Sequence, residues 1–265
     1  MGTNISDSFI FYLTFVIKST GPANLDHLRY LVKMLADCLL RHVLSFSLQD
    51  TPLPAGVHVL DPFHGPHADE VRRIVTAFHR KYYNDERPRT LMLGINPGRL
   101  GAGSTGLSFT DTKRCESDLG IPVQGIRTHE PSSDFFYRMI HAAGGPAAFY
   151  SQVYVHAVCP LGFVKEQTNG SAINLNYYDD KALEQAVTPF VEAWLRTLVH
   201  CGMRTDTVLC IGTGKNAAYF TKLNERLGLF DRIIALEHPR YVMQYKARSL
   251  EVYIDRYLQA LNEVL

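Results

Sequence analysis

The amino-acid sequence predicts a single α/β domain, with a central four-stranded, parallel, twisted sheet flanked by helices on both faces. Four short apolar runs have the length of buried strands, at 90–95, 153–158, 207–211 and 232–236. Amphipathic segments of helical length lie between them. No linker, internal repeat or low-complexity tract interrupts the chain. Strands that alternate with helices are typical of βαβ units, whose strands run parallel and are covered on both faces.

The composition is typical of a soluble globular protein, with 46% hydrophobic and 20% charged residues among 265. The 27 basic and 26 acidic residues give a formal net charge of +1. This balance excludes a generally polycationic nucleic-acid coat but not a local basic face. No apolar run reaches the roughly 18 residues that a membrane span needs, so we expect no membrane association.

The N-terminal part is expected to be helical. Residues 1–24 form an extension to which we assign no role. A helical stripe over 25–48 is followed by a break rich in proline at 49–56, and a second helix is expected over 68–83. We therefore expect 25–89 to be a helical lead-in packed on an α/β core at 90–265, so that 25–265 forms one compact domain. The stripe consists of Leu28, Leu31, Leu35, Leu39 and Val43.

The C-terminal part supplies the remaining helices. Ser132 or Ser133 is expected to cap a helix that ends near Ile140, and further helices are expected at 179–199, 215–227 and 242–261. In parallel sheets, ligands bind beyond the carboxyl ends of the strands. The segments that follow the four strands are therefore expected to converge on one crevice; they are 96–99, 159–161, 212–215 and 237–240.

The five cysteines are scattered, odd in number and without a C-x-x-C pair. This pattern argues against a disulfide framework, a zinc finger and an iron–sulfur cluster. We expect unpaired thiols, no metal, and a reducing compartment such as the cytoplasm or the nucleus. The five are Cys38, Cys115, Cys159, Cys201 and Cys210.

Two glycine-rich segments are candidates for phosphate or cofactor binding. Residues 101–106 match G-x-G-x-x-G, but Pro97 separates them from the strand and no helical periodicity follows, so the context of a dinucleotide site is missing. Residues 212–216 resemble the end of a phosphate loop, but Asn216 stands where a hydroxyl should hold magnesium. Lys215 and the start of its helix remain candidates for contact with a phosphate.

The segment 238–248 carries three basic side chains and no acidic one, with two tyrosines between them. Cations mixed with aromatic rings suit phosphate contact and base stacking on nucleic acid. His238 lies at a predicted strand end, as does Asn96. The basic residues are Arg240, Lys246 and Arg248, and the tyrosines are Tyr241 and Tyr245.

Two motifs resemble a known family. Residues 94–98 (GINPG) followed by 105–109 (TGLSF) are similar to the first motif of the uracil-DNA glycosylase superfamily, in the form G-M-N-P-G with T-G-V-P-F of its single-strand-selective monofunctional (SMUG) branch. The likeness continues through 119–123, 155–156 and 159–161, and ends with His238-Pro239 as the second motif. It covers roughly 90–261, and the helical lead-in is most similar to the bacterial SMUG-two subfamily.

The resemblance implies a monofunctional DNA glycosylase of base excision repair, which flips a deaminated base into a pocket and leaves an abasic site. Asn96 would position the attacking water, His238 would stabilise the departing base, and Phe109 would stack on it. The pocket would be completed by Gly94, Ile95, Pro97, Gly98 and Ala157. No lysine occupies a nucleophile position in either motif, so no lyase step is expected. The implied protein is a monomer without cofactors, bound to DNA in the cytoplasm or nucleoid, or in a eukaryotic nucleus.

The sequence departs from the SMUG pattern at two places. Ala157 follows His156 where the pattern has an asparagine that reads uracil, which predicts a weaker preference for uracil and acceptance of larger deaminated bases, xanthine above all. The usual H-P-S-P is His238-Pro239-Arg240-Tyr241, so we expect Arg240 or Tyr241, rather than Met243, to be wedged into the duplex. Further DNA contacts are expected from Lys113, Arg114, Lys215, Lys246 and Arg248.

Two alternatives remain open at this stage. The first is a nucleic-acid-binding module of the same fold with little or no catalysis, suggested by Ala157. The second is a cofactor-binding α/β enzyme that uses the glycines of 101–106.

Overall fold

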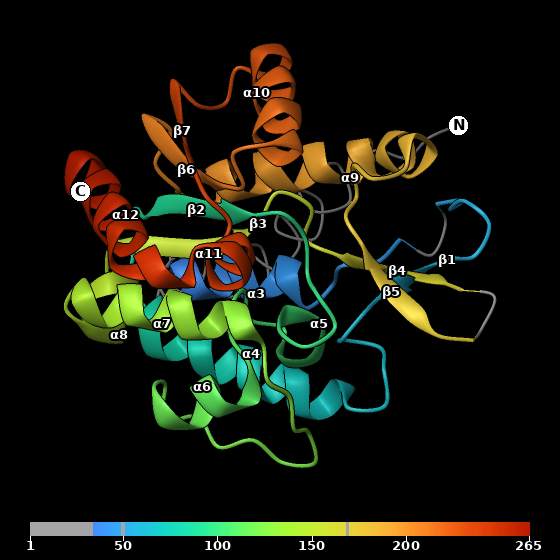
Figure 1. The fold of residues 1–265 in the computed structure, drawn as a ribbon, viewed down its shortest axis with the longest axis horizontal. Coiled ribbons are helices and arrows are strands. Elements are labelled where there is room, and N and C mark those ends of the chain that lie inside the picture. Colours follow the sequence, from blue (N-terminus) through green and yellow to red (C-terminus); the bar gives the residue numbers. More distant parts are fainter. Residues whose placement is uncertain (1–33, 49–50, 168–169) are drawn as a thin grey trace, which may run out of the picture.

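The computed structural model describes residues 34–48, 51–167 and 170–265. Its centre is a parallel sheet in the strand order β3-β2-β6-β7 (Figure 1), which confirms the predicted fold class. Each observed strand agrees with a predicted one to within one residue. The strands are β2 (Thr90–Gly94), β3 (Val153–Ala157), β6 (Thr207–Ile211) and β7 (Arg232–Leu236).

Burial along the strands explains why this sheet is covered on both faces. Every residue of β2, β3 and β6 is buried, although successive side chains of a strand point to opposite faces. The edge strand β7 is partly exposed. The covering helices are α4 (Ala68–Tyr82), α7 (Pro131–Ala142), α8 (Gly145–Tyr150), α9 (Lys181–His200), α10 (Lys215–Leu227) and α12 (Leu250–Val264).

A second, antiparallel sheet was not predicted. It consists of β1 (Val57–Leu60), β4 (Gly162–Glu166) and β5 (Ala172–Leu175) in the order β1-β4-β5, and Figure 1 shows it beside the main sheet. The three strands are short and partly exposed, so they carry no continuous apolar run. Pairing of β1 with β4, far apart in the sequence, creates the sheet.

Two helix predictions were wrong in detail. Helix α7 begins at Pro131, and neither Ser132 nor Ser133 is its N-cap; Glu130 holds that position. Proline suits the first helical position because its fixed φ is already helical and its missing N–H would have no partner. The helix expected over 242–261 is divided into α11 (Pro239–Tyr245), the 3₁₀ turn Ala247–Ser249, and α12.

The described part of the helix predicted over 25–48 is α3 (Leu35–Val43), which buries Leu35, Leu39 and Val43 of the predicted stripe and packs on α4. The rest of the lead-in, 25–89, contains the strand β1 as well as α4. The extension 1–24 and the part of the predicted helix before residue 34 lie outside the described residues. Two short helices, α5 (Ala102–Thr105) and α6 (Thr112–Ser117), follow β2. None of the described helices is both long and apolar enough to cross a bilayer.

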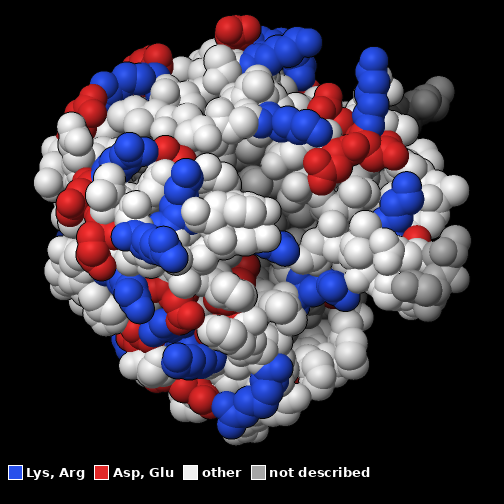
Figure 2. All heavy atoms as spheres, in the orientation of Figure 1, with Lys and Arg blue, Asp and Glu red and all other residues white. Residues whose placement is uncertain are grey.

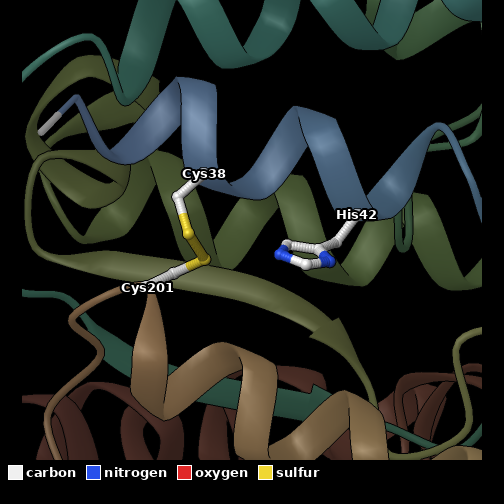
Figure 3. A group of neighbouring side chains, drawn as sticks. All are labelled: Cys38, His42 and Cys201. Atoms are coloured by element: carbon white, nitrogen blue, oxygen red, sulfur yellow. A yellow bond between two sulfur atoms is a disulfide. The ribbon is translucent and has the colours of Figure 1, made fainter. Parts of the chain in front are cut away.

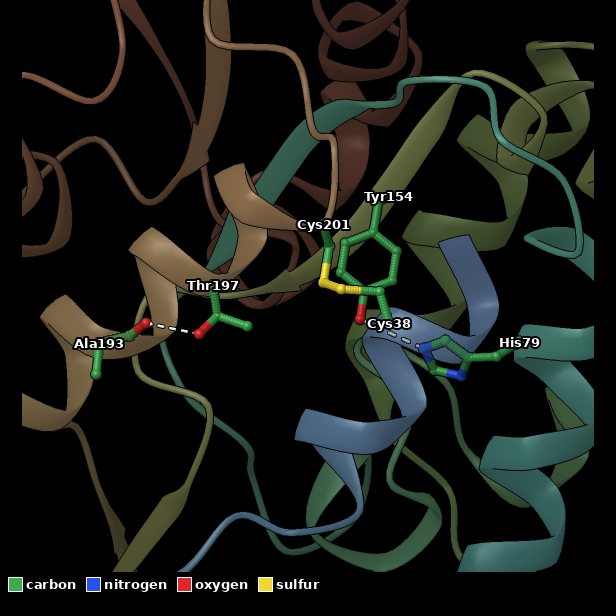
Figure 4. The surroundings of a disulfide bond; sticks show 6 residues. All are labelled: Cys38, His79, Tyr154, Ala193, Thr197 and Cys201. Atoms are coloured by element: carbon green, nitrogen blue, oxygen red, sulfur yellow. Dashed lines mark hydrogen bonds between the residues drawn. A yellow bond between two sulfur atoms is a disulfide. The ribbon is translucent and has the colours of Figure 1, made fainter. Parts of the chain in front are cut away.

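The prediction of unpaired cysteines was wrong for two of the five. Cys38 on α3 and Cys201 at the end of α9 form a disulfide bond across 163 residues of sequence (Figures 3 and 4). The other three cysteines are free and buried. Sequence spacing cannot reveal this pair, because the packing of the lead-in on α9 brings the two residues together. The expectation of a reducing compartment was based on unpaired cysteines, so the disulfide removes part of the basis for it.

Candidate active site

A cavity of about 430 Å³ lies beyond the carboxyl ends of β2 and β3. The two expected catalytic residues, Asn96 and His238, both line it, as do all six residues expected to bind the base: Gly94, Ile95, Pro97, Gly98, Phe109 and Ala157. The predicted convergence of four strand ends is only partly right, because neither 159–161 nor 212–215 is among the lining residues. The antiparallel sheet contributes Asn174, and Asn176 follows its last strand.

Asn96 is held by main-chain atoms of the segment that follows β5. Its Nδ2 donates to the carbonyl oxygen of Leu175 at 3.3 Å, and its Oδ1 accepts from the N–H of Tyr177 at 3.2 Å. A carbonyl oxygen has two lone pairs, so Oδ1 retains one site for a further donor. The orientation of the amide is thereby fixed, with acceptor capacity left for a water molecule.

The main chain of α11 selects the tautomer of His238. The N–H of Arg240 donates to Nδ1 of His238 at 3.1 Å, so Nδ1 carries no proton in the neutral ring and Nε2 does. Burial, with a contribution from the Arg240 charge, lowers the pKa of His238 to about 4. At neutral pH the residue is therefore an uncharged ring with one N–H to donate.

Phe109 is positioned by strained backbone and by close packing. It has a positive φ of 54°, a rare conformation for a bulky residue. Thr105 fixes this turn, since its Oγ1 donates to the carbonyl oxygen of Thr110 and accepts from the N–H of Leu107. The ring stacks on Phe136 with centroids 4.6 Å apart. One face of Phe109 is thus covered by the core, and the residue also lines the cavity.

The position of the Phe109 ring requires a glycine at position 94. A Cβ atom at this position would lie 2.9 Å from Cζ of Phe109, closer than real Cβ contacts. The glycine that opens the first motif therefore makes room for the Phe109 side chain, which belongs to the second half of that motif.

Glu130 is an acidic residue of the cavity that the sequence analysis did not single out. Its Oε2 is buried and has no hydrogen-bond partner among the described residues. Burial, and then the charge of Asp111, raise the pKa of Glu130 to about 7, although the Arg240 charge lowers it. Asp111 itself is fully buried and accepts from the N–H groups of Arg114 and Glu130 and from the Ser133 hydroxyl. This carboxylate joins the two loops that carry Phe109 and Glu130.

The expected DNA-contacting residues fall into two groups. Arg240 and Tyr241 line the cavity. The rings of Tyr241 and Tyr245 are tilted at 45° with centroids 5.5 Å apart, and both tyrosines are exposed. Met243 is half-buried and does not line it. Lys246 and Arg248 are exposed just beyond α11.

The remaining three cations lie elsewhere. Lys215 is 3.9 Å from Asp179, and Lys113 lines a separate hollow with Arg127. Arg114 is only 16% exposed and pairs with Asp118 and Asp134, which contradicts its expected contact with DNA. Basic and acidic side chains are interspersed over the face drawn in Figure 2.

The glycines of 101–106 are explained by packing. A Cβ atom on Gly103 would lie 2.3 Å from Cδ2 of Leu60, and one on Gly106 would lie 2.5 Å from Cγ2 of Val75. Gly106 also has a positive φ of 73° and ends α5. The motif thus allows the loop after β2 to approach β1 and α4 closely. No cofactor is needed to account for it.

The described residues contain one cluster with the donor atoms of a metal site, formed by Cys38, His42 and Cys201. Figure 3 shows the His42 ring beside the disulfide. Because the two sulfurs are bonded to each other, the thiolates that would bind a metal are not present in this state. None of the three residues lines the cavity.

Several lining residues were missed because their sequence contexts carry no motif. Asn174 lies in β5, a strand that was not predicted, and Asn176 follows it; Ser132 and Glu130 lie at the start of α7. Gln244 and Tyr245 belong to the divided C-terminal helix. The available signal was the run of aromatic and basic residues in 238–248, which indicated this surface but not the position of each side chain.

The fold and the cavity together define a class: α/β proteins with a pocket between an Asn-Pro-Gly loop and a His-Pro helix start. Residues 80–262 match the Uracil DNA glycosylase superfamily, and the chain belongs to it, within the SMUG-like branch. The crystal structure of wild-type Pedobacter heparinus SMUG2 is similar, with a TM-score of 0.84 and 45% identity over 87% of this chain and 98% of that chain.

Two mammalian relatives cover a smaller part. The chain is 29% identical over 165 residues to the single-strand selective monofunctional uracil-DNA glycosylase of Rattus norvegicus, and 27% identical over 163 residues to that of Mus musculus. Each match covers 52% of this chain and 55% of the relative, so the chain spans about half the length of these proteins.

Proposed function

We propose that this protein is a monofunctional DNA glycosylase that hydrolyses the N-glycosidic bond of deaminated bases, uracil and larger bases such as xanthine, and leaves an abasic site. The observation that carries the proposal is the fixed Nε2–H tautomer of His238 in a cavity that also holds Asn96 and Phe109. A neutral donor in this place suits a reaction in which negative charge develops on the departing base.

The reaction begins with extrusion of the base, at a cost of a few kcal/mol for unstacking and unpairing. Phe109 stacks on the base, and Nε2–H of His238 donates to it as the bond to C1′ breaks and its electron pair moves onto the base. Asn96 Oδ1 orients the water whose oxygen bonds to C1′. The proton released by the water ends on solvent or on the departing base. An amide is a poor general base, so loss of the base precedes attack by water. No step uses a lysine, in keeping with a monofunctional enzyme.

The test compares wild-type protein with Asn96→Ala and His238→Ala on labelled oligonucleotides that contain uracil, hypoxanthine or xanthine. Alkali-sensitive strand breaks should form with the wild type and fall by at least about a hundredfold in both variants. Breaks without alkali would contradict the monofunctional assignment. DNA binding without release of any base would instead favour a binding module, the alternative suggested by Ala157.

Contact with DNA beyond the extruded base is proposed for α11 and the residues just after it. Arg240 and Tyr241 are the candidates for insertion into the duplex, and Lys246 and Arg248 for phosphate contact. Replacing either of the latter two with Ala should reduce the salt dependence of binding by about one unit. Lys113 and Lys215 serve as comparisons, since they lie apart from the cavity. A slope that is unchanged by Lys246→Ala and Arg248→Ala would remove both from the binding surface.

A further inference from the structure

The segment between β5 and α9 is fixed relative to the reacting centre. Leu175 accepts from Asn96 Nδ2 and Tyr177 donates to Asn96 Oδ1, at 3.3 and 3.2 Å. Asn176 is the residue between them. Its own N–H donates to Asp179 Oδ2 at 3.0 Å, which fixes the backbone of this turn. The position of Asn176 beside Asn96 is therefore determined by the main chain and does not depend on its side chain.

The side chain of Asn176 is available for a ligand. It is half-buried and lines the cavity, yet its amide has no hydrogen-bond partner among residues 34–48, 51–167 and 170–265. Asn174, two residues earlier, differs because it is exposed and its Oδ1 accepts from Nε of Arg99 at 3.2 Å. In the empty cavity water can satisfy this half-buried amide, and a bound ligand that displaces the water has to replace its hydrogen bonds.

We infer that the side-chain amide of Asn176 reads the N–H/C=O edge of the extruded base, a role that rests on the proposed glycosylase function. An asparagine offers one acceptor and two donors, so it binds an adjacent N–H and C=O with two hydrogen bonds. Uracil, hypoxanthine and xanthine all present this pair of groups on their Watson–Crick edge. One amide therefore accounts for the recognition of deaminated bases of different size.

Asn96 and the residue at position 157 do not offer a free side-chain amide for this task. Ala157 contributes only a methyl group, and its carbonyl oxygen already accepts from Trp194 Nε1 at 3.1 Å. The Asn96 amide is committed to the backbone, and Gln244 is exposed on α11. The base edge is thus recognised from the side of the cavity that the antiparallel sheet forms. Ala157 carries only a methyl group, so this position leaves room for a larger base.

The experiment combines a protein change with a substrate change. Base release by wild type, Asn176→Ala and Asn176→Asp is measured on oligonucleotides with uracil and with N3-methyluracil, which lacks the N–H. For uracil, Asn176→Ala should lose about tenfold to hundredfold in kcat/KM, as expected for two lost hydrogen bonds. Asn176→Asp should lose at least as much, because an ionised carboxylate cannot donate to the base carbonyl. Asn262→Ala, the same change on the exposed face of α12, should match the wild type.

The effects of substituting Asn176 and of methylating N3 should not add, and this non-additivity distinguishes direct recognition of the base from an indirect effect. Methylation of N3 should reduce wild-type activity at least about tenfold and leave Asn176→Ala nearly unaffected. An equal methylation penalty in both proteins would overturn the inference, because Asn176 would then act only through Asn96 or through the fold. Asn176→Leu, which has a similar side-chain volume and neither donates nor accepts a hydrogen bond, provides the same comparison if Asn176→Ala does not fold. If wild type released none of the bases, the proposed function itself would fail.

Discussion

Single atoms determine the shape of the cavity. The absence of a Cβ atom at Gly94 gives Phe109 its place, and Phe136 fills the space behind the ring. The fixed N–H of Arg240 decides which nitrogen of His238 carries the proton. The contacts of Phe109 with Gly94 and Phe136 join residues that are separated in the sequence, whereas the contact of Arg240 with His238 is local. Changes at this scale should therefore alter catalysis more than folding.

Gly94→Ala should displace the Phe109 ring, because the added carbon would lie 2.9 Å from it and Phe136 prevents retreat. We expect kcat/KM to fall by at least about tenfold, with a stability cost of about 1–3 kcal/mol for overpacking. Base-release assays and denaturant unfolding measure the two effects. Gly65→Ala is the control, since its added Cβ would be at an ordinary 3.5 Å from the nearest atom. Unchanged activity in Gly94→Ala would refute the role of Phe109.

Glu130 should make base release sensitive to pH above neutrality. Its pKa is raised to about 7, so the side chain is neutral below this value and negative above it. A negative charge in the cavity opposes the anion that forms on the departing base. We expect wild-type kcat/KM to decline from pH 7 to 9 and that of Glu130→Gln to stay level. Glu251→Gln, on the exposed side of α12, should retain the wild-type decline. Identical profiles for Glu130→Gln and wild type would contradict this assignment.

Among the elements, the lead-in helix α3 is joined to the core by packing on α4 and by the Cys38–Cys201 disulfide. Figure 4 shows that the disulfide lies near Tyr154 of β3, whose hydroxyl is 3.3 Å from Nε2 of His79 on α4. The bond therefore connects α3 to the end of α9 close to the main sheet. It closes a loop that includes most of the described chain.

Loss of this disulfide should destabilise the protein by about 4 kcal/mol, since cross-linking a long loop restricts the unfolded chain strongly. Urea unfolding of wild type with and without dithiothreitol measures the effect. Cys38→Ser should behave like the reduced wild type under both conditions. His42→Ala, next to the disulfide, should keep the dependence on reductant. A wild-type midpoint that does not respond to reductant would show that the bond does not form in solution.

Elements differ in how well the sequence predicts them. The four strands of the main sheet carry continuous apolar runs because both faces are buried, and these runs are visible without a structure. The antiparallel strands β1, β4 and β5 are short and partly exposed, and the pairing of β1 with β4 is long-range. Asn176 reaches the cavity because it follows this sheet. Without a prediction of the sheet, the residue could not be placed in the cavity.

For the whole molecule, the buried His79 and His156 and the half-buried His238 link stability to pH. Burial lowers the pKa of His79 to about 4, and burial together with neighbouring positive charges lowers those of His156 to about 3 and His238 to about 4. The unfolded chain binds these protons near pH 6.5, and the folded chain does not. Stability is therefore fully present above about 6.5 and falls as the pH decreases toward 4.

Unfolding free energies at pH 7, 6, 5 and 4 should decrease accordingly. In His79→Gln, the slope over this range should be shallower by up to about 1 kcal/mol per pH unit, because one proton is no longer taken up on unfolding. His200→Gln, a change of an exposed histidine at the end of α9, should retain the wild-type slope. Equal slopes in all three proteins would place the acid sensitivity in other groups.

The sequence by itself determined the parallel α/β fold, the strand positions and the two motifs that bring Asn96, Phe109 and His238 to one cavity. These features are local, since apolar runs and turn residues specify them within short stretches of chain. Only the tertiary structure decided that Cys38 pairs with Cys201, that Arg114 is committed to ion pairs, and that Glu130 and Asn176 line the cavity. Each of these features depends on contacts between segments that are distant in the sequence. The spacing of residues along one chain does not indicate which distant segments will meet.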